Sequence, residues 1–266
     1  MSKGRLRETF QDLKKKDQKA FVAYIMGGDG GIGRLISDIL YLQESGADVI
    51  EVGVPFSDPV ADGPVIQDAG LRALKEGTTL KSILKEIQEG KDKIKVPIVL
   101  MTYINPVLQY GIREFSRDSA AAGIAGCIFP DLPLEEEGLI SSVLTEANIA
   151  IIRLASLTST EDRLEKLAGS SEGFLYAVTV KGVTGQRARL ETEELAARVR
   201  TIKQFTDTPV LAGFGISSAD TAGGVLPFCD GVIVGSKIVA ALHEGERETI
   251  RELIGEIKGL HAVSAR

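Results

Sequence analysis

The chain has 266 residues, of which 44% are hydrophobic and 26% are charged, and its formal net charge is −6 at pH 7. This composition supports a sizeable core and excludes disordered, collagen-like and disulfide-scaffold proteins. The acidic balance, without a long basic tract, argues against a nucleic-acid-binding surface. It does not exclude a phosphate ligand, because backbone N–H groups and helix dipoles bind anions without lysine or arginine.

Cysteine, histidine and the N-terminal segment exclude several further classes. Cys127 and Cys229 lie in apolar segments without CxxC spacing, which indicates buried structural thiols in a reducing compartment. His243 and His261 lack the spacing of metal ligands, so no metal site is predicted. The N-terminus is charged and amphipathic, unlike a signal peptide, and no apolar run approaches the roughly 20 residues of a membrane-spanning helix. We therefore expect a soluble, cytoplasmic protein.

An extra helix is expected first, over about residues 2–16, and short apolar runs follow at regular spacing along the chain. Their continuous Val- and Ile-rich character is typical of strands covered on both faces, as in a parallel sheet. Eight runs are found, at residues 21–26, 48–54, 97–103, 125–129, 150–154, 174–180, 209–212 and 230–234.

Amphipathic stretches between these runs predict helices. One begins at Ser159-Thr160, where hydroxyl caps precede two acids, and another at Thr192. Residues 135–147 and 237–260 complete the pattern. No linker interrupts the series, so the sequence predicts one domain over residues 1–266, a (β/α)₈ TIM barrel with an extra N-terminal helix. The alternative is a doubly wound open sheet, which usually carries fewer strands.

Three consecutive runs, the sixth to the eighth, are followed by glycine-rich turns at residues 181–187, 213–217 and 235–236. Barrels often bind phosphate with the loops after strands seven and eight, where glycine lets backbone N–H groups approach the oxygens. Any one of these turns alone is explained by the turn it makes, but three together favour a phosphate site. Residues 182–187 also have the composition of a lid that closes over a ligand.

Acidic residues occur where a barrel interior should be apolar. Glu51 lies inside a β-branched run, where an unpaired carboxylate costs several kcal/mol or becomes neutral through a raised pKa. This favours a functional acid, and an ion pair with Arg153 in the fifth run is the alternative. Asp58 and Asp62 in the next loop, like Asp131 after the fourth run, fit turn or cap residues as well as site residues.

The segment EVGVPFSDPVADGPVIQ at residues 51–67 resembles the α-subunit family of tryptophan synthase. GVTG at 182–185, GFGIS at 213–217, VGSKIV at 234–239 and the FPDLP segment follow in the family's order, so that the resemblance covers essentially the whole chain. It implies a lyase of tryptophan biosynthesis that cleaves indole-3-glycerol phosphate by a retro-aldol reaction into indole and glyceraldehyde 3-phosphate.

The resemblance also implies roles for individual residues. Glu51 would be the general acid/base, and Asp62 would accept a hydrogen bond from the indole N–H. Both roles agree with the chemistry, since a retro-aldol cleavage needs a movable proton and an acceptor for developing positive charge. The residues implied to surround the substrate are Tyr24 and Met101 at the indole, Tyr176 beside the general acid, Thr184 on the lid, and Gly185, Gly213, Gly215, Gly235 and Ser236 at the phosphate.

A protein partner is implied as well. The loop with Asp58 and Pro59, together with Asn105 and Pro106, corresponds to the surface that meets the tryptophan synthase β-subunit in an α₂β₂ heterotetramer. That partner carries pyridoxal phosphate (PLP) and receives the indole, so no cofactor is expected in this chain.

Two other functions compete with this interpretation. Lys181 ends the sixth run and could be the amine of a Schiff-base aldolase that acts on another sugar phosphate. The chain could also be a ligand-sensing barrel that only activates a partner. GVTG and the Glu51/Asp62 pair favour acid/base cleavage over the first, and a carboxylate inside the core favours an enzyme over the second.

Overall fold

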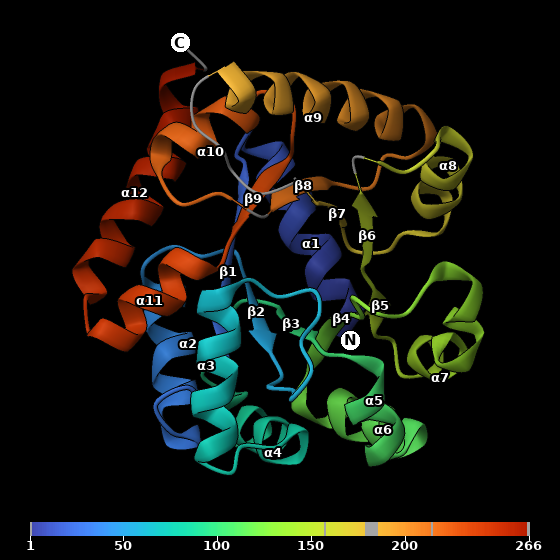
Figure 1. The fold of residues 1–266 in the computed structure, drawn as a ribbon, viewed down its shortest axis with the longest axis vertical. Coiled ribbons are helices and arrows are strands. Elements are labelled where there is room, and N and C mark those ends of the chain that lie inside the picture. Colours follow the sequence, from blue (N-terminus) through green and yellow to red (C-terminus); the bar gives the residue numbers. More distant parts are fainter. Residues whose placement is uncertain (1, 157, 179–185, 214, 265–266) are drawn as a thin grey trace.

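The computed structural model describes residues 2–156, 158–178, 186–213 and 215–264, with residues 2, 186–192 and 260–264 described by their backbone alone. Parallel strands occupy the centre and helices surround them (Figure 1). The strands are β1 (Ala20–Met26), β2 (Val49–Gly53), β3 (Ile98–Met101), β4 (Ile124–Ile128), β5 (Ala150–Ile151), β6 (Arg153–Ser156), β7 (Leu175–Val178), β8 (Val210–Gly213) and β9 (Gly231–Val234).

The helices of the described residues alternate with these strands, which confirms the predicted barrel class. They are α1 (Ser2–Lys15), α2 (Leu35–Glu44), α3 (Pro64–Lys75), α4 (Leu80–Gly90), α5 (Ile104–Tyr110), α6 (Ile112–Ala122), α7 (Ser141–Glu146), α8 (Glu161–Ser170), α9 (Gln186–Phe205), α10 (Ala219–Val225), α11 (Ser236–Glu244) and α12 (Arg247–Ser264), with 3₁₀ turns η1 (Ile32–Arg34) and η2 (Leu134–Leu139).

The fifth predicted strand is divided into two, so nine strands are described where the sequence predicted eight. The sheet order is β5-β4-β3-β2-β1-β9-β8-β7-β6, and its two ends, β5 and β6, are separated in the chain by Ile152 alone. β5 pairs with β4, whereas β6 pairs with β7. The ring of eight units is therefore nearly closed, and the break lies where β6 turns away from β4.

Two hydrophobic layers account for the core. Alternate strand residues, such as Val22 and Tyr24, belong to an interior cluster, and the residues between them, such as Ala23, pack against the surrounding helices. Helix α1 joins the interior cluster through Leu6 and Phe10, and the Phe10 ring lies 5.7 Å from that of Phe174. Phe174 directly precedes β7, so this contact places the extra helix at the end of the barrel where the strands begin.

Acidic side chains form hydrogen bonds and ion pairs with the first residues of the strands at this same end. Asp48, directly before β2, accepts a hydrogen bond from the backbone N–H of Phe21 at 2.8 Å. It also forms an ion pair with Lys258 of α12 at 2.7 Å. Asp230, directly before β9, accepts the N–H of Val210 at 2.8 Å. Each carboxylate joins the beginnings of two strands that are separated by an intervening helix.

Helix boundaries differ from the sequence expectations in three places. Thr160 caps α8 as predicted, but α9 begins at Gln186 and not at Thr192, because the preceding residues are themselves good helix formers. The stretch 135–147 is a 3₁₀ turn followed by a short helix. The stretch 237–260 is two helices, since Gly245 adopts the left-handed conformation (φ 78°) that ends α11.

Candidate active site

Glu51 is placed inside the barrel by strand alternation. β2 pairs with β1 so that Glu51 lies opposite Tyr24, and the Glu51 side chain is completely buried. Neither carboxylate oxygen accepts a hydrogen bond from the residues that the structure describes. The alternative pair with Arg153 is wrong, because Arg153 binds Glu137 on the outer side of the strands, with Nε 2.8 Å from Oε1.

The electrostatics of Glu51 follow from this burial. Burial raises the pKa of Glu51 to about 8, and the nearby Asp62 carboxylate raises it further. Removing a carboxylate from water disfavours its charged form, and a like charge acts in the same direction. Glu51 is therefore protonated at neutral pH and can donate a proton.

Asp62 is held beside Glu51 by a residue that the sequence interpretation did not select. Burial raises the pKa of Asp62 to about 6, and a hydrogen bond with the side chain of Tyr103 opposes the rise. The Tyr103 hydroxyl also accepts the N–H of Ala61 at 2.9 Å, and its ring stacks on Phe56 at 5.1 Å. Tyr103 thus fixes the loop that carries Asp62, which is ionised at neutral pH. Its position at the end of the third apolar run, where barrel site residues are expected, was the available signal.

The predicted pocket residues Tyr24, Met101 and Tyr176 are all buried members of the interior cluster. Two glycines make room for the tyrosine rings. A methyl group at Gly53 would overlap the Tyr24 hydroxyl, and one at Gly213 would overlap the Tyr176 ring. Gly213 therefore has a packing reason of its own, in addition to the phosphate role that the resemblance implies.

The described part of the predicted phosphate site lies at the ends of two adjacent strands. Gly213 ends β8, Gly215 has a positive φ of 82°, and Gly235 is the N-cap of α11, whose first residue is Ser236. No described side chain caps α11, whereas Ser218 caps α10 with a capping box. The N–H groups of the first turn of α11 are thus available to an anion.

Some predictions in this region cannot be placed. Lys181, Thr184 and Gly185 lie outside the described residues, as does most of the predicted lid at 182–187. Its last two residues, Gln186 and Arg187, begin α9.

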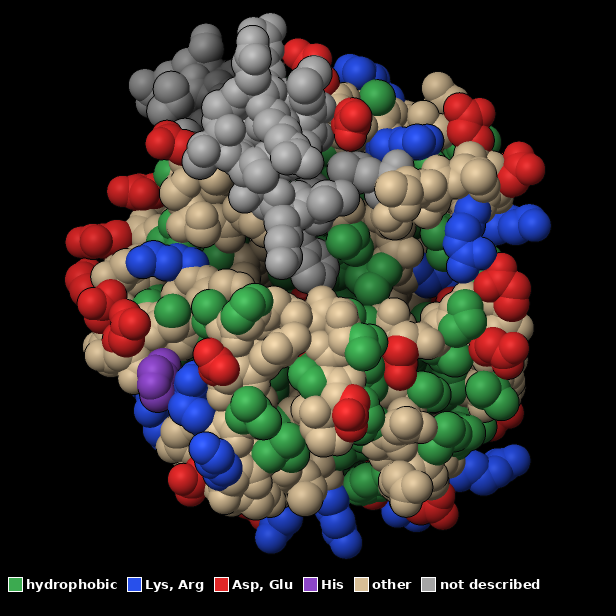
Figure 2. All heavy atoms as spheres, viewed as in Figure 1, with side chains coloured by type: hydrophobic (Ala, Val, Ile, Leu, Met, Phe, Trp, Pro, Cys, Tyr) green, Lys and Arg blue, Asp and Glu red, His purple; other side chains and the backbone are tan. Residues whose placement is uncertain are grey.

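Residues predicted to contact a partner lie on the loops after β2 and β3. Asp58 and Asn105 are exposed, and Pro59 and Pro106 are partly exposed. In contrast, Asp131 has a structural explanation, since its carboxylate accepts the N–H of Ile104 at the start of α5 at 3.0 Å. Figure 2 shows hydrophobic side chains between charged ones over α3, α5 and α6.

Exposed hydrophobic residues accompany the predicted contact loops. Val60, on the loop after β2, is 85% exposed, and Leu108, on α5, is 46% exposed. Single exposed apolar residues are common on protein surfaces, but these two lie on the same loop and helix as the residues predicted to meet a partner.

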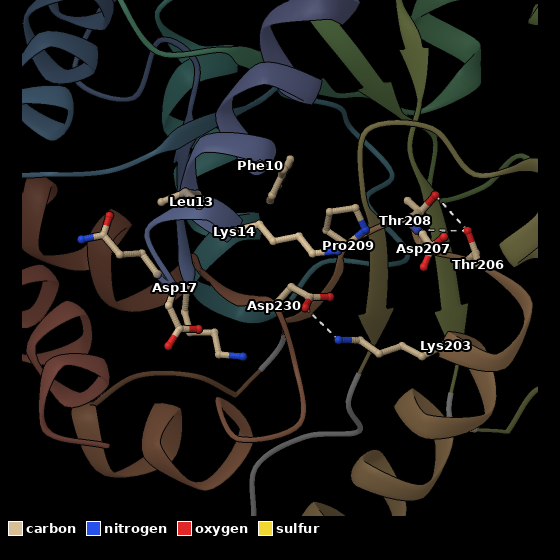
Figure 3. A pocket seen from close by; sticks show the side chains of 12 residues that line it. Phe10, Leu13, Lys14, Asp17, Lys203, Thr206, Asp207, Thr208, Pro209 and Asp230 are labelled. Carbon is tan, nitrogen blue, oxygen red and sulfur yellow. Dashed lines mark hydrogen bonds and ion pairs between the residues drawn. The ribbon is translucent and has the colours of Figure 1, made fainter. Parts of the chain in front are cut away.

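A separate cavity of about 250 Å³ lies at the opposite end of the barrel, beside the C-terminal end of α1 (Figure 3). Its walls include residues that directly precede strands, such as Lys19 and Pro209, and Lys203 there is paired with Asp230 at 2.7 Å. None of the predicted site residues lines it, and barrel enzymes react at the other end. We therefore do not assign the reaction to this cavity.

The other predicted structural features are placed as follows. Cys127 and Cys229 are buried free thiols, and His243 is exposed on α11. Among the described residues, no group of three or more His, Cys, Asp or Glu side chains is arranged to hold a metal ion. In the same part of the chain, no helix is both long and apolar enough to cross a membrane.

Fold and site together define the class of protein. A nearly closed parallel barrel carries two carboxylic acids of raised pKa, Glu51 within β2 and Asp62 on the loop that follows it, together with an uncapped helix N-terminus suited to phosphate. This is the arrangement of a (β/α)₈-barrel enzyme of acid/base chemistry.

Comparison with known proteins identifies the family. The family model described as tryptophan synthase alpha chain matches residues 10–263. The tryptophan synthase alpha chain of Oceanobacillus iheyensis is 51% identical over 97% of this chain and 98% of its own length, and one from Bacillus cereus is 47% identical over 96% of both.

Solved structures agree with these relatives. A ligand-free tryptophan synthase from Mycobacterium tuberculosis superimposes with a TM-score of 0.86 at 35% identity, covering 96% of this chain and 98% of that one. The alpha subunit from Legionella pneumophila gives 0.86 at 32% identity, covering 97% and 98%. The chain belongs to the tryptophan synthase alpha chain family. It is a lyase of tryptophan biosynthesis, and the α reaction of this family cleaves indole-3-glycerol phosphate.

Proposed function

We propose that this chain cleaves indole-3-glycerol phosphate with Glu51 as the general acid/base and Asp62 as the electrostatic partner. The observation that carries the proposal is the fully buried Glu51 carboxyl group beside Asp62, an arrangement that raises the pKa of Glu51 to about 8 and keeps it above that of Asp62. Glu51 protonates indole C3, and the resulting carboxylate then takes the proton of the glycerol hydroxyl as the carbon–carbon bond breaks. Asp62 accepts the indole N–H and stabilises the positive charge that develops on the ring.

Other residues would hold the substrate. Tyr24 and Met101 flank the indole ring, and Tyr176 lies beside Glu51. The phosphate is bound by backbone N–H groups and the start of α11, which favours an anion through its dipole. The residues proposed at the phosphate are Gly185, Gly213, Gly215, Gly235 and Ser236, with Thr184 closing over the substrate.

The proposal also assigns a destination to the indole product. Indole passes to a β-subunit docked on the loops with Asp58, Pro59, Asn105 and Pro106, within an α₂β₂ heterotetramer. PLP belongs to that subunit, and this chain uses no cofactor of its own. Residues 1–266 act as one barrel domain in the cytoplasm.

Indole release from indole-3-glycerol phosphate, with and without a β-subunit, tests the proposal. We expect slow cleavage by the chain alone, acceleration by the partner, and loss of most turnover in Glu51→Gln with binding of a phosphate analogue retained. Asp62→Ala should lose roughly two orders of magnitude or more in rate. Wild-type-like turnover in Glu51→Gln would show that another group moves the proton, and a borohydride-stable adduct on Lys181 would establish Schiff-base chemistry instead.

A further inference from the structure

A second cavity lies where the barrel wall is interrupted. Its volume is about 450 Å³, and it lies among β5, β6, the segment that follows β4, and α8. The volume is within the range of small-molecule sites, roughly 300–1,000 Å³. None of the residues proposed for substrate binding or catalysis lines it, so this cavity is separate from the site described above.

The cavity extends across the wall of the barrel. Ile152 and Leu154 on its lining belong to or pack against the interior cluster, whereas Phe129 and Ile151 belong to the layer under the helices. Both kinds of residue border one space because β6 leaves β4 and pairs only with β7 among the described strands. A ligand bound here would touch side chains that also form the wall of the substrate chamber.

The chemistry of the lining favours a neutral ligand. Arg153 is paired with Glu137 at 2.8 Å, and Arg163 at the outer edge is paired with Glu135 at 2.8 Å. The Asp131 carboxylate is occupied by the N–H of Ile104. Both cations of this lining are thus already paired, whereas the Asp131 carboxylate is exposed, so an anionic ligand would be desolvated here without a free counter-charge.

The remaining lining favours a flat aromatic molecule. Nine of the thirteen lining residues have apolar side chains, and the Arg153 guanidinium is a planar cation suited to an aromatic face. The Glu137 carboxylate, only 12% exposed, is an acceptor for one ring N–H, because a carboxylate has about four acceptor positions.

We propose that this cavity is a second binding site for a neutral aromatic heterocycle with one N–H donor, namely indole, the product of the reaction. The identity of the ligand rests on the proposed function. Indole fits the site in size, flatness and neutrality, and its single N–H fits the Glu137 carboxylate. The substrate does not fit, since its phosphate would find no unpaired cation on this lining.

Diffraction with 5-bromoindole locates the ligand directly. We expect an anomalous bromine peak in this cavity of the wild-type chain and its loss in two variants that fill the space, Leu132→Phe and Leu167→Phe. Leu132 is partly exposed, so at least this variant should fold even if the buried Leu167 does not tolerate the larger ring. The matched control is Leu139→Phe, which changes a 52% exposed residue of η2 that does not line the cavity.

Equilibrium dialysis with indole tests the site in solution. The chain contains no tryptophan, so indole can be quantified by its own fluorescence without background from protein indole groups. We expect wild type and Leu139→Phe to bind one equivalent of indole in this cavity, in addition to indole bound in the barrel mouth. In the two filled variants, indole should bind to this cavity about tenfold more weakly or worse. Bromine in the barrel mouth alone, or equal dialysis curves for all four proteins, would overturn the inference.

The two proposals fail in different ways. Cleavage of indole-3-glycerol phosphate with no bromine in the cavity would refute the second site and leave the proposed reaction intact. Bromine in the cavity of a chain that releases no indole would refute the proposed reaction, and with it indole as the physiological ligand.

Discussion

Glu51 shows how a single buried residue links function to stability. Its side chain is fully buried and its carboxylate has no hydrogen-bond partner among the described residues. An unpaired carboxylate is tolerated there because it is neutral, and the same neutrality makes it a proton donor at pH 7. The catalytic role proposed for Glu51 therefore depends on an arrangement that destabilises the folded chain at higher pH.

The first prediction concerns stability against pH. The folded state raises the Glu51 pKa from 4.5 to about 8, so between these values the folded chain holds a proton that the unfolded chain releases. The free energy of unfolding should therefore fall as pH rises through this window. Urea denaturation at several pH values should show a smaller decline for Glu51→Gln. The exposed Glu89→Gln is the matched control, and equal declines in all three proteins would contradict the assignment.

The second prediction concerns Tyr103. Its hydrogen bond favours the charged form of Asp62 and so lowers the pKa of Asp62 against the effect of burial. Tyr103→Phe should raise this pKa above about 6 and move the acidic limb of the kcat/KM profile to higher pH. Tyr110→Phe removes a hydroxyl bonded to Asp118 on the outer surface and is the control. An unmoved limb in Tyr103→Phe would show that Asp62 does not set it.

At the scale of elements, the strand starts depend on side chains distant in sequence. Asp48 joins the first residues of β1 to α12, through Phe21 and Lys258. Asp48→Ala should lower the free energy of unfolding by about 1–3 kcal/mol, since it removes a hydrogen bond to a charged group and leaves a buried N–H unpaired. Chemical denaturation measures this, with the exposed Asp92→Ala as the control. A change within about 0.5 kcal/mol would indicate that the bond contributes little.

The elements also show how far local patterns determine structure. Every described strand lies wholly or partly in one of the eight apolar runs, because parallel strands covered on both faces need continuous apolar sequence. Local signals were less reliable for the ends of helices. The cap-like Thr192 lies inside α9, and the fifth run is divided at Ile152, since its two halves pair with different neighbours. The residue pattern of one segment does not indicate with which other strand its backbone will form hydrogen bonds.

At the scale of the whole molecule, the loops after β2 and β3 form one proposed contact surface. Leu108 is 46% exposed on α5 beside Asn105 and Pro106. Leu108→Glu should weaken binding of a β-subunit by about tenfold or more, because it places a charge in an apolar contact. Calorimetric titration and the β-dependent increase in indole release measure this. Leu71→Glu, on α3 at 51% exposure, is the control, and equal binding by both variants would remove Leu108 from the interface.

The sequence by itself determined the barrel, the buried position of Glu51 and the glycine-rich turns, because periodicity, a carboxylate in an apolar run and backbone flexibility are local properties. Asp62 was paired with Glu51 only through the family resemblance. Only the tertiary structure decided that Arg153 pairs with Glu137 and that Tyr103 holds Asp62. It also decided that a cavity opens at the break in the barrel wall. These features depend on which side chains from distant segments come into contact, and burial at these contacts then sets the pKa values of the acidic groups. The sequence specifies such tertiary contacts only through the complete fold.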